Sequence, residues 1–146
     1  MTPRSTALGE ARDTAALLMA VTERTRRNFE DVAATFDLTP QQARALLALE
    51  SAAPMRALAD HMHCDASNIT GIADRLESRG FVARAARDGD RRVKMLALTA
   101  DGKKLRSALE AAIVDASPVM TALDSKERAT LRALLAKAAI TEGSRT

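Results

Sequence analysis

Residues 66–80, with the sequence ASNITGIADRLESRG, decide the fold of this chain of 146 residues. Ile69, Ile72, Ala73 and Leu76 follow one another at the spacing i, i+3, i+4 and i+7, which predicts a helix with one buried face. The opposite face carries small hydrogen-bonding side chains and one arginine, namely Ser67, Asn68, Thr70, Gly71, Asp74, Arg75 and Ser78. Such a face fits the major groove of DNA, where side chains reach the edges of the bases.

The segments on either side of this helix complete a motif. Apolar residues at helical spacing predict a short helix over residues 55–62, and residues 63–65 make a tight turn between the two helices. Beyond Gly80, residues 81–86 and 91–99 have the composition of extended strands around the turn sequence RDGD. The order helix, tight turn, helix and hairpin predicts a winged helix-turn-helix, a mainly α fold with a small β-hairpin wing.

The predicted wing is rich in positive charge. Residues 79–94 contain two aspartates, Asp88 and Asp90, and six basic residues, Arg79, Arg84, Arg87, Arg91, Arg92 and Lys94. Arginines at a hairpin turn can contact phosphates or enter the minor groove, which favours Arg91 and Arg92 as DNA contacts, with Lys94 near the tip. We expect Asp90 to hold an arginine side chain extended before binding, so that less rotamer entropy is lost. A solvated charged hairpin is the alternative.

Gly71 is an unfavourable residue in the middle of the predicted helix. Glycine costs about 1 kcal/mol relative to alanine in a helix interior. Two explanations remain open from the sequence: the backbone approaches an external surface closely there, or a neighbouring helix packs against it.

Further helices flank this motif. We expect the first dozen residues to be loose and a helix to begin near Asp13. Thr39, Pro40 and Gln42 form a capping box that starts the next helix. Thr99 starts a long helix that breaks at Pro118. A last helix follows Asp124 and Glu127, and it carries a strong apolar stripe.

The composition narrows the class of protein. Apolar residues make up 47% of the chain and aromatic residues only 2%, which suits helix-on-helix packing. We find no apolar run long enough to cross a bilayer and no secretory signal, and one cysteine cannot form an internal disulfide, so we expect a cytoplasmic protein. No arrangement of nucleophile, base and orienting group and no phosphate-binding glycine loop is present, so we expect no enzymatic activity and no cofactor.

The stretch HMHCD at 61–65 covers the end of the first helix and the turn, and it holds both histidines and the cysteine of the chain. His61 and His63 are two residues apart and would not share a helix face. With Cys64 they supply three donors, fewer than the four of a structural zinc site. We therefore expect no metal site, and packing of Cys64 in the turn is the favoured interpretation.

The whole pattern resembles the MarR (multiple antibiotic resistance regulator) family of transcription factors. The resemblance runs through LTPQQARALLALE at 38–50, through residues 55–105 and through LDSKERATLRALLAKA at 123–138. Its most specific parts are SNITGIADRLESRGFV, the wing sequence DGDRR and LALTADGKKL.

The resemblance implies one MarR-type domain over residues 1–146, with dimerisation helices at 13–38 and 100–146 and a DNA-binding part at 39–99. It implies a homodimer that binds a palindromic operator, usually as a repressor, with Ser67, Asn68, Thr70 and Arg75 as major-groove contacts and Arg92 at the wing tip.

The resemblance further implies a small-molecule effector, often a phenolic or aromatic acid, in a pocket beside the dimerisation helices. The plausible lining residues are Met19, Arg27, Phe29, Met55 and Met62. Methionine and phenylalanine at helical spacing are more often core residues. A redox regulator that uses cysteine and a winged-helix module that binds another protein are the alternatives. Similar peroxide sensors place their cysteine in the first helix, where this chain has none.

Overall fold

The structure is a computed structural model, and it describes residues 3–139. The described chain is mainly helical, with one small antiparallel sheet. It divides into two compact units, one from Phe29–Ile113 and the other from the described parts of Met1–Asn28 and Val114–Thr146. The prediction of a mainly α fold with a β-hairpin wing is confirmed.

The first helix, α1, is longer than the sequence suggested. It runs over Pro3–Thr35, so the expectation of a loose segment before Asp13 was wrong. Residues 7–12 are mostly strong helix formers such as alanine, leucine, glutamate and arginine. Pro3 is also compatible with a first helical turn, because its missing N–H would have no partner there. Gly9 is the one weak helix former among residues 7–12, and its neighbours outweigh it.

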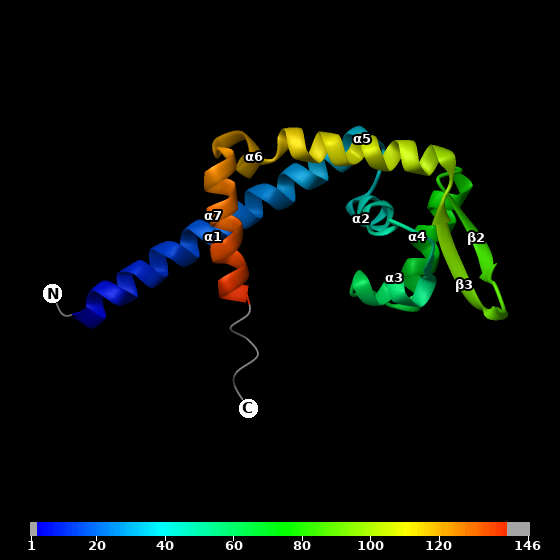
Figure 1. The fold of residues 1–146 in the computed structure, drawn as a ribbon, viewed down its shortest axis with the longest axis horizontal. Coiled ribbons are helices and arrows are strands. Elements are labelled where there is room, and N and C mark those ends of the chain that lie inside the picture. Colours follow the sequence, from blue (N-terminus) through cyan, green and yellow to red (C-terminus); the bar gives the residue numbers. More distant parts are fainter. Residues whose placement is uncertain (1–2, 140–146) are drawn as a thin grey trace, which may run out of the picture. The chain divides into compact units, whose positions relative to one another are not determined.

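The helix that follows Thr39 in the Phe29–Ile113 unit begins at the capping box that the sequence predicted. α2 spans Pro40–Ala48, and the Thr39 and Gln42 side chains each accept a hydrogen bond from the other residue's backbone N–H. α3 spans Met55–His61 and α4 spans Ala66–Ser78. Figure 1 shows these helices grouped beside the wing. The helix-turn-helix and its wing thus lie within one compact unit.

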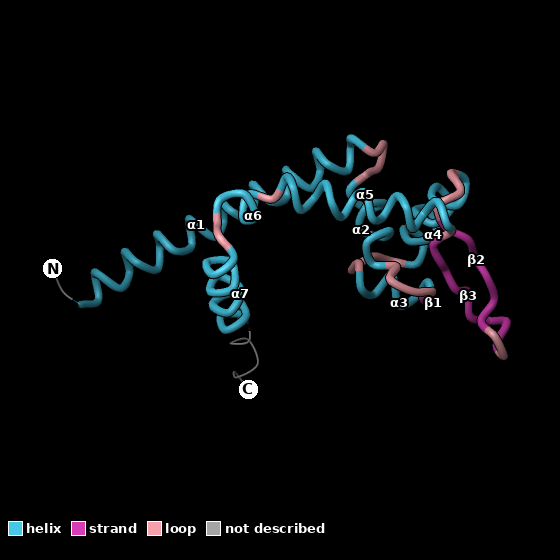
Figure 2. Tube along the Cα trace, turned by 45° about the horizontal axis from the view of Figure 1, so that its top comes forward, coloured by secondary structure: helices cyan, strands magenta, loops and turns pink. Residues whose placement is uncertain are grey.

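The sheet has a strand that the sequence analysis missed. β2 (Val82–Arg87) and β3 (Asp90–Leu98) form the predicted hairpin, which is drawn as the magenta pair in Figure 2. A third strand, β1 (Ala53–Pro54), pairs with the other edge of β3 at Leu96 and Met95. Pro54 is compatible with an edge strand, because the N–H that proline lacks need not bond there. The outer half of the wing remains two-stranded.

The core of this unit is aliphatic, as the composition predicted. Its largest fully buried side chains are Leu46, Leu49, Ile69, Leu76, Val82, Leu96 and Leu109. The buried face of α4 consists of Ile69, Ile72, Ala73 and Leu76, which confirms the face predicted from their spacing.

A dense junction joins the start of α5 (Ala100–Ala116) to the turn that follows α4. The Thr99 backbone N–H donates to the Phe81 carbonyl at 3.0 Å, and its hydroxyl donates to the Gly80 carbonyl at 2.6 Å. Gly102 donates in turn to the Thr99 hydroxyl oxygen at 3.0 Å, and it is buried. A Cβ atom added to Gly102 would lie 1.9 Å from the Phe81 carbonyl oxygen, so only glycine fits here.

The other unit contains the first part of α1, the end of α5, α6 (Pro118–Ala122) and α7 (Ser125–Ala139). Ser117 caps α6 where the predicted break occurs, and Asp124 with Glu127 forms the predicted cap of α7. Exposed large apolar side chains of this unit are Leu8, Leu17, Leu18, Met19, Val21, Val114, Met120, Leu134 and Leu135. Among the described residues, no helix has both the length and the apolar character to span a membrane.

Candidate nucleic-acid interface

The outward face of α4 is exposed and polar. Ser67, Arg75 and Ser78 are exposed, and Gly71 lies between them on the same side of the helix. The Ser78 hydroxyl donates to the Arg75 carbonyl at 2.9 Å, whereas the guanidinium of Arg75 has no partner among residues 3–139. The face therefore offers one unengaged arginine and several small side chains to an external surface.

Gly71 has open space where its side chain would be. A Cβ atom built on it meets no heavy atom within 4 Å, apart from the helix's own nearby backbone. Close packing against a neighbouring helix would place atoms there, so the structure does not support that explanation within this chain. Close approach of an external surface remains the explanation for a glycine at this position.

The start of α4 is fixed by a carboxylate. Asp65 accepts hydrogen bonds from the Asn68 backbone N–H at 2.7 Å and from the Ser67 hydroxyl at 2.8 Å. These two bonds lower the pKa of the Asp65 carboxyl, because both stabilise its ionised form. The bond from the Asn68 N–H has the larger effect, and the bond from Ser67 has the smaller one. Ser67 was predicted to contact DNA in the major groove. Because its hydroxyl donates its hydrogen bond to Asp65, only its acceptor sites remain for other partners.

The lowered pKa of Asp65 predicts a pH-dependent contribution to stability. Asp65→Ala should have a lower free energy of unfolding than the wild type at pH 7. The pKa of Asp65 in the folded protein lies below its value of about 3.9 in the unfolded chain. The stability that the ionised carboxylate contributes is therefore fully present above the unfolded pKa. It is lost as the pH falls through the folded pKa, so the two proteins should converge in urea titrations at low pH.

Asp65→Asn is the matched control, because asparagine caps a helix about as well as aspartate but does not titrate in this range. It should keep most of the stability at pH 7 without the acid-dependent part. A difference in unfolding free energy between wild type and Asp65→Ala that stays constant from about pH 7 to about pH 2.5, on both sides of the unfolded pKa of about 3.9, would contradict the assigned role.

The wing turn has the predicted position but a different role for its aspartate. Gly89 has a φ of 82°, a conformation that favours glycine, and it follows Asp88 at the tip. Asp90 accepts a hydrogen bond from the backbone N–H of Arg92 at 3.0 Å. We expected Asp90 to hold an arginine side chain, but no ion pair joins it to Arg91 or Arg92 in the described chain. Asp90 instead shapes the backbone of the tip, because an aspartate can bond a backbone N–H two residues on.

The six basic residues of the wing region divide into two groups. The Arg79 guanidinium donates to the Asp37 carbonyl at 2.7 Å and lies 5.0 Å from the centre of the Phe81 ring. Arg84 is held by two carboxylates of α4. The four others are exposed, and their side chains have no partner among residues 3–139; they are Arg87, Arg91, Arg92 and Lys94. These four side chains, which we call the free wing cations, carry the charge available to an external partner.

Predicted contacts on the flank of α4 are also partly engaged. Thr70 donates its hydroxyl to the Ala66 carbonyl at 2.7 Å, and its own carbonyl accepts from Arg84 at 3.3 Å. Asp74 pairs with Arg84 at 2.6 Å. These two residues therefore lie on the side of α4 that meets the wing, whereas Ser67, Gly71 and Arg75 point outward.

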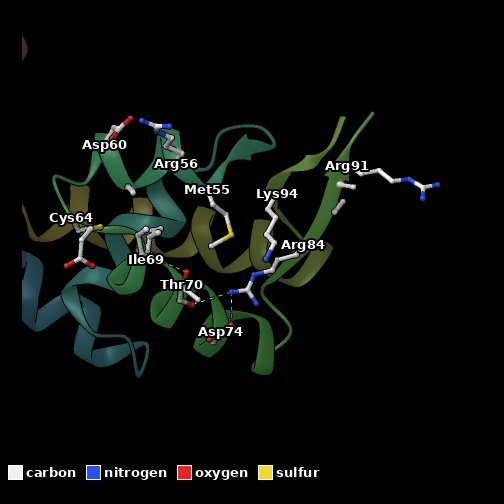
Figure 3. A pocket seen from close by; sticks show the side chains of 15 residues that line it. Met55, Arg56, Asp60, Cys64, Ile69, Thr70, Asp74, Arg84, Arg91 and Lys94 are labelled. Atoms are coloured by element: carbon white, nitrogen blue, oxygen red, sulfur yellow. Dashed lines mark hydrogen bonds and ion pairs between the residues drawn. The ribbon is translucent and has the colours of Figure 1, made fainter. Parts of the chain in front are cut away.

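A groove of about 940 Å³ lies between α3, α4 and the wing. Met55, Arg56, Arg84 and Lys94 line it, and Figure 3 shows Arg91 extended away from it. Of the five residues predicted to line an effector pocket, Met55 lies here. Phe29 and Met62 belong to the same unit but do not line this groove: the Phe29 ring packs under Arg44, and Met62 is half-buried at the end of α3. Met19 and Arg27 belong to the other unit, where Met19 is exposed and Arg27 pairs with Glu23.

Both histidines and the cysteine of the chain lie at the end of α3 and in the turn before α4. His61 and His63 are exposed, and Cys64 is half-buried on the wall of the groove. His63 has a φ of 51°, and the Cys64 N–H donates to the Ala59 carbonyl at 3.0 Å. Within residues 3–139, no three His, Cys, Asp or Glu side chains are grouped so that they could hold a metal ion. The turn connects α3 to α4 and places Cys64 against the groove.

Comparison with known proteins identifies related chains. Residues 38–94 match the model of the MarR family. The chain is 35% identical over 71 residues to YfiV, an uncharacterized HTH-type transcriptional regulator of Bacillus subtilis, and this match covers 47% of the chain and 44% of the relative. The chain thus spans less than half the length of this curated relative.

Two solved structures have the same fold. Wild-type apo MarR from E. coli is 24% identical, with a TM-score of 0.72, and the match covers 85% of this chain and 94% of that one. A MepR variant from S. aureus, bound to an oligodeoxyribonucleotide, is 18% identical with a TM-score of 0.61, and the match covers 88% and 96% of the two chains. At these identities the likeness establishes the fold.

Proposed function

We propose that this chain, whose residues 38–94 match the model of the MarR family, is a DNA-binding transcriptional regulator rather than an enzyme. One observation carries the proposal: the exposed outward face of α4 lies in the same unit as a wing with four free wing cations. The helix has the size and polarity to enter a major groove. The cations have the charge and position to contact phosphates or the minor groove. We assign base contacts to Ser67, Asn68 and Arg75; Thr70, whose hydroxyl bonds the Ala66 carbonyl on the side of α4 that meets the wing, is left out of this set.

We further propose a homodimer that binds an inverted repeat. The exposed apolar side chains of α1 and α7 support it, because Leu17, Met19 and Leu134 are 60 to 70% exposed and would be covered by a second copy. A two-fold dimer presents its recognition helices about one DNA turn, or about 34 Å, apart.

The test is enrichment of duplexes from a random-sequence pool by the full chain, followed by footprinting and sedimentation. The expected result is an inverted repeat with that spacing, bound by two chains. A single asymmetric site bound by one chain would refute the dimer. If no duplex is enriched above background at low salt, the proposal of DNA binding fails, and a winged-helix protein-interaction module becomes the better explanation.

Arg92→Ala tests the wing. Arg92 is the free wing cation whose backbone Asp90 fixes, so we assign it a phosphate or minor-groove contact. Its loss should weaken binding to enriched and random duplexes alike, and it should reduce the slope of log K against log salt by about one. Fluorescence anisotropy at several salt concentrations measures both quantities. An unchanged affinity and slope would exclude Arg92 from the interface.

Repression and its relief by a small molecule complete the proposal. The match to the MarR family model supports both repression and its relief. The groove beside α4 is a place where a bound molecule would lie next to the elements that we propose to contact DNA. Phenolic and carboxylic acids are the first compounds to test in a thermal-shift screen. A compound that raises the melting temperature and weakens binding to the enriched duplex would support the proposal. A complete lack of response to the screen would count against acids of this class.

A further inference from the structure

Arg84 is the most heavily engaged side chain of the wing. It lies on β2 and is 26% exposed, and its guanidinium contacts two carboxylates of α4: Asp74 at 2.6 Å and Glu77 at 2.9 Å. The same guanidinium donates to the Thr70 carbonyl at 3.3 Å, as the dashed lines of Figure 3 show in part. The backbone N–H of Arg84 donates to the second oxygen of Glu77 at 3.2 Å. One residue of the wing thus makes four contacts with three residues of the recognition helix.

These contacts occur where the sheet changes from three strands to two. β1 pairs with β3 at Leu96 and Met95, and Arg84 is the partner of Leu96 on the other side of β3. Beyond Met95 the hairpin has only two strands, and an isolated two-stranded hairpin is at best marginally stable in water. The Arg84 contacts therefore anchor the hairpin to α4 at the base of its weakest part.

A small movement at this base would displace the free wing cations. Arg87 is three residues beyond Arg84 on β2, so at about 3.3 Å per residue it lies about 10 Å further out. The turn at Asp88 and Gly89 lies beyond Arg87, and Arg92 follows this turn near the start of β3. A change of hairpin angle at Arg84 would therefore shift the tip relative to α4 by ångströms, and the two DNA contacts must match one fixed duplex geometry.

We propose that Arg84 is a positioning residue rather than a DNA contact: it binds Asp74 and Glu77 and thereby fixes the wing relative to the recognition helix, so that both engage one duplex together. This inference rests on the proposed DNA-binding function and deepens it. It also explains two acidic residues beside a DNA-binding face, because both carboxylates are partners of the same guanidinium.

The sharpest test is the double substitution Asp74→Asn with Glu77→Gln. It removes two negative charges, so electrostatics alone predicts tighter binding to DNA. The positioning role predicts the opposite: about tenfold weaker binding to the duplex enriched by the wild type, and a smaller loss on a random-sequence duplex of equal length. Tighter binding to both duplexes would overturn the proposal.

Arg84→Gln completes a mutant cycle. On its own it should weaken binding to the enriched duplex by about tenfold without changing the salt slope, since no phosphate contact is lost. In the Asp74→Asn, Glu77→Gln background it should change little, because the contacts are already broken. Arg87→Gln is the matched control, because the loss of this free wing cation should reduce the slope of log K against log salt. A slope reduced by about one for Arg84→Gln in both backgrounds would make Arg84 a phosphate ligand and overturn the proposal.

Amide hydrogen exchange gives a readout that needs no DNA. The Arg84 amide, which bonds Glu77, and the amides of the outer hairpin should exchange about tenfold faster in Arg84→Gln and in the double variant, with those of Ile69 to Leu76 unchanged. Unchanged wing exchange would overturn the positioning role in a folded protein. If the wild type enriches no duplex, the proposed function fails, but the exchange result still decides whether Arg84 fixes the wing.

Discussion

Gly102→Ala is expected to lower the free energy of unfolding by about 3 kcal/mol, because the added methyl group would overlap backbone atoms. The new Cβ would lie 1.9 Å from the Phe81 carbonyl oxygen and 2.9 Å from its carbonyl carbon. Those atoms are backbone, and the Phe81 carbonyl already accepts the Thr99 N–H at 3.0 Å, so they cannot rotate away as a flexible side chain would. The start of α5 must separate from the turn after α4.

Urea unfolding at pH 7, followed by circular dichroism, measures the change. Gly9→Ala in α1 is the matched control, because a Cβ built there meets nothing within 4 Å. It should stabilise the helix slightly, since alanine is the better helix former. If Gly102→Ala unfolds at the same urea concentration as the wild type, the close contact at this junction does not exist in the folded protein.

Gly71→Ala should have effects of opposite sign on stability and on DNA binding. It should raise the free energy of unfolding by about 1 kcal/mol, because Gly71 lies inside α4 and its Cβ position is open. The same methyl group would project from the outward face into a closely apposed duplex. We expect it to weaken binding to the enriched duplex by about tenfold, the size of a modest steric conflict.

Both quantities are measured on one protein sample, by urea unfolding and by fluorescence anisotropy. Ser78→Ala is the matched control on the same face, because it removes a hydroxyl and adds no bulk. A Gly71→Ala protein that is more stable and binds DNA as tightly as the wild type would show that no surface approaches the helix backbone at this position. A less stable protein would contradict the open space around Gly71.

Local patterns were sufficient wherever a structure depends on neighbours along the chain. The i, i+3, i+4, i+7 spacing predicted the buried face of α4, the Thr39–Gln42 box predicted the start of α2, and RDGD predicted the hairpin turn. Helix faces, caps and tight turns depend on residues within about four positions of one another, so one sequence contains all the information they need. The same locality limited the prediction for α1, where no strong cap marked the start.

Contacts between segments that are far apart along the chain could not be predicted from local sequence patterns. β1 has only two residues, and its pairing with β3 spans some forty positions that no local pattern records. The role of Arg84 was also hidden, because its partners on α4 come close only when the hairpin folds against the helix. A count of charges placed all six basic residues of the wing region in one cluster, and only their partners separate Arg79 and Arg84 from the others.

The order of elements, the buried face of the recognition helix and the excess of basic residues in the wing could be predicted from the chain alone. Each of these follows from residue type and short-range spacing. Which charges are free, what Asp90 binds, and whether Gly71 is packed or open became visible in the folded protein. Those properties depend on distances between side chains that lie far apart along the chain, and folding alone sets those distances.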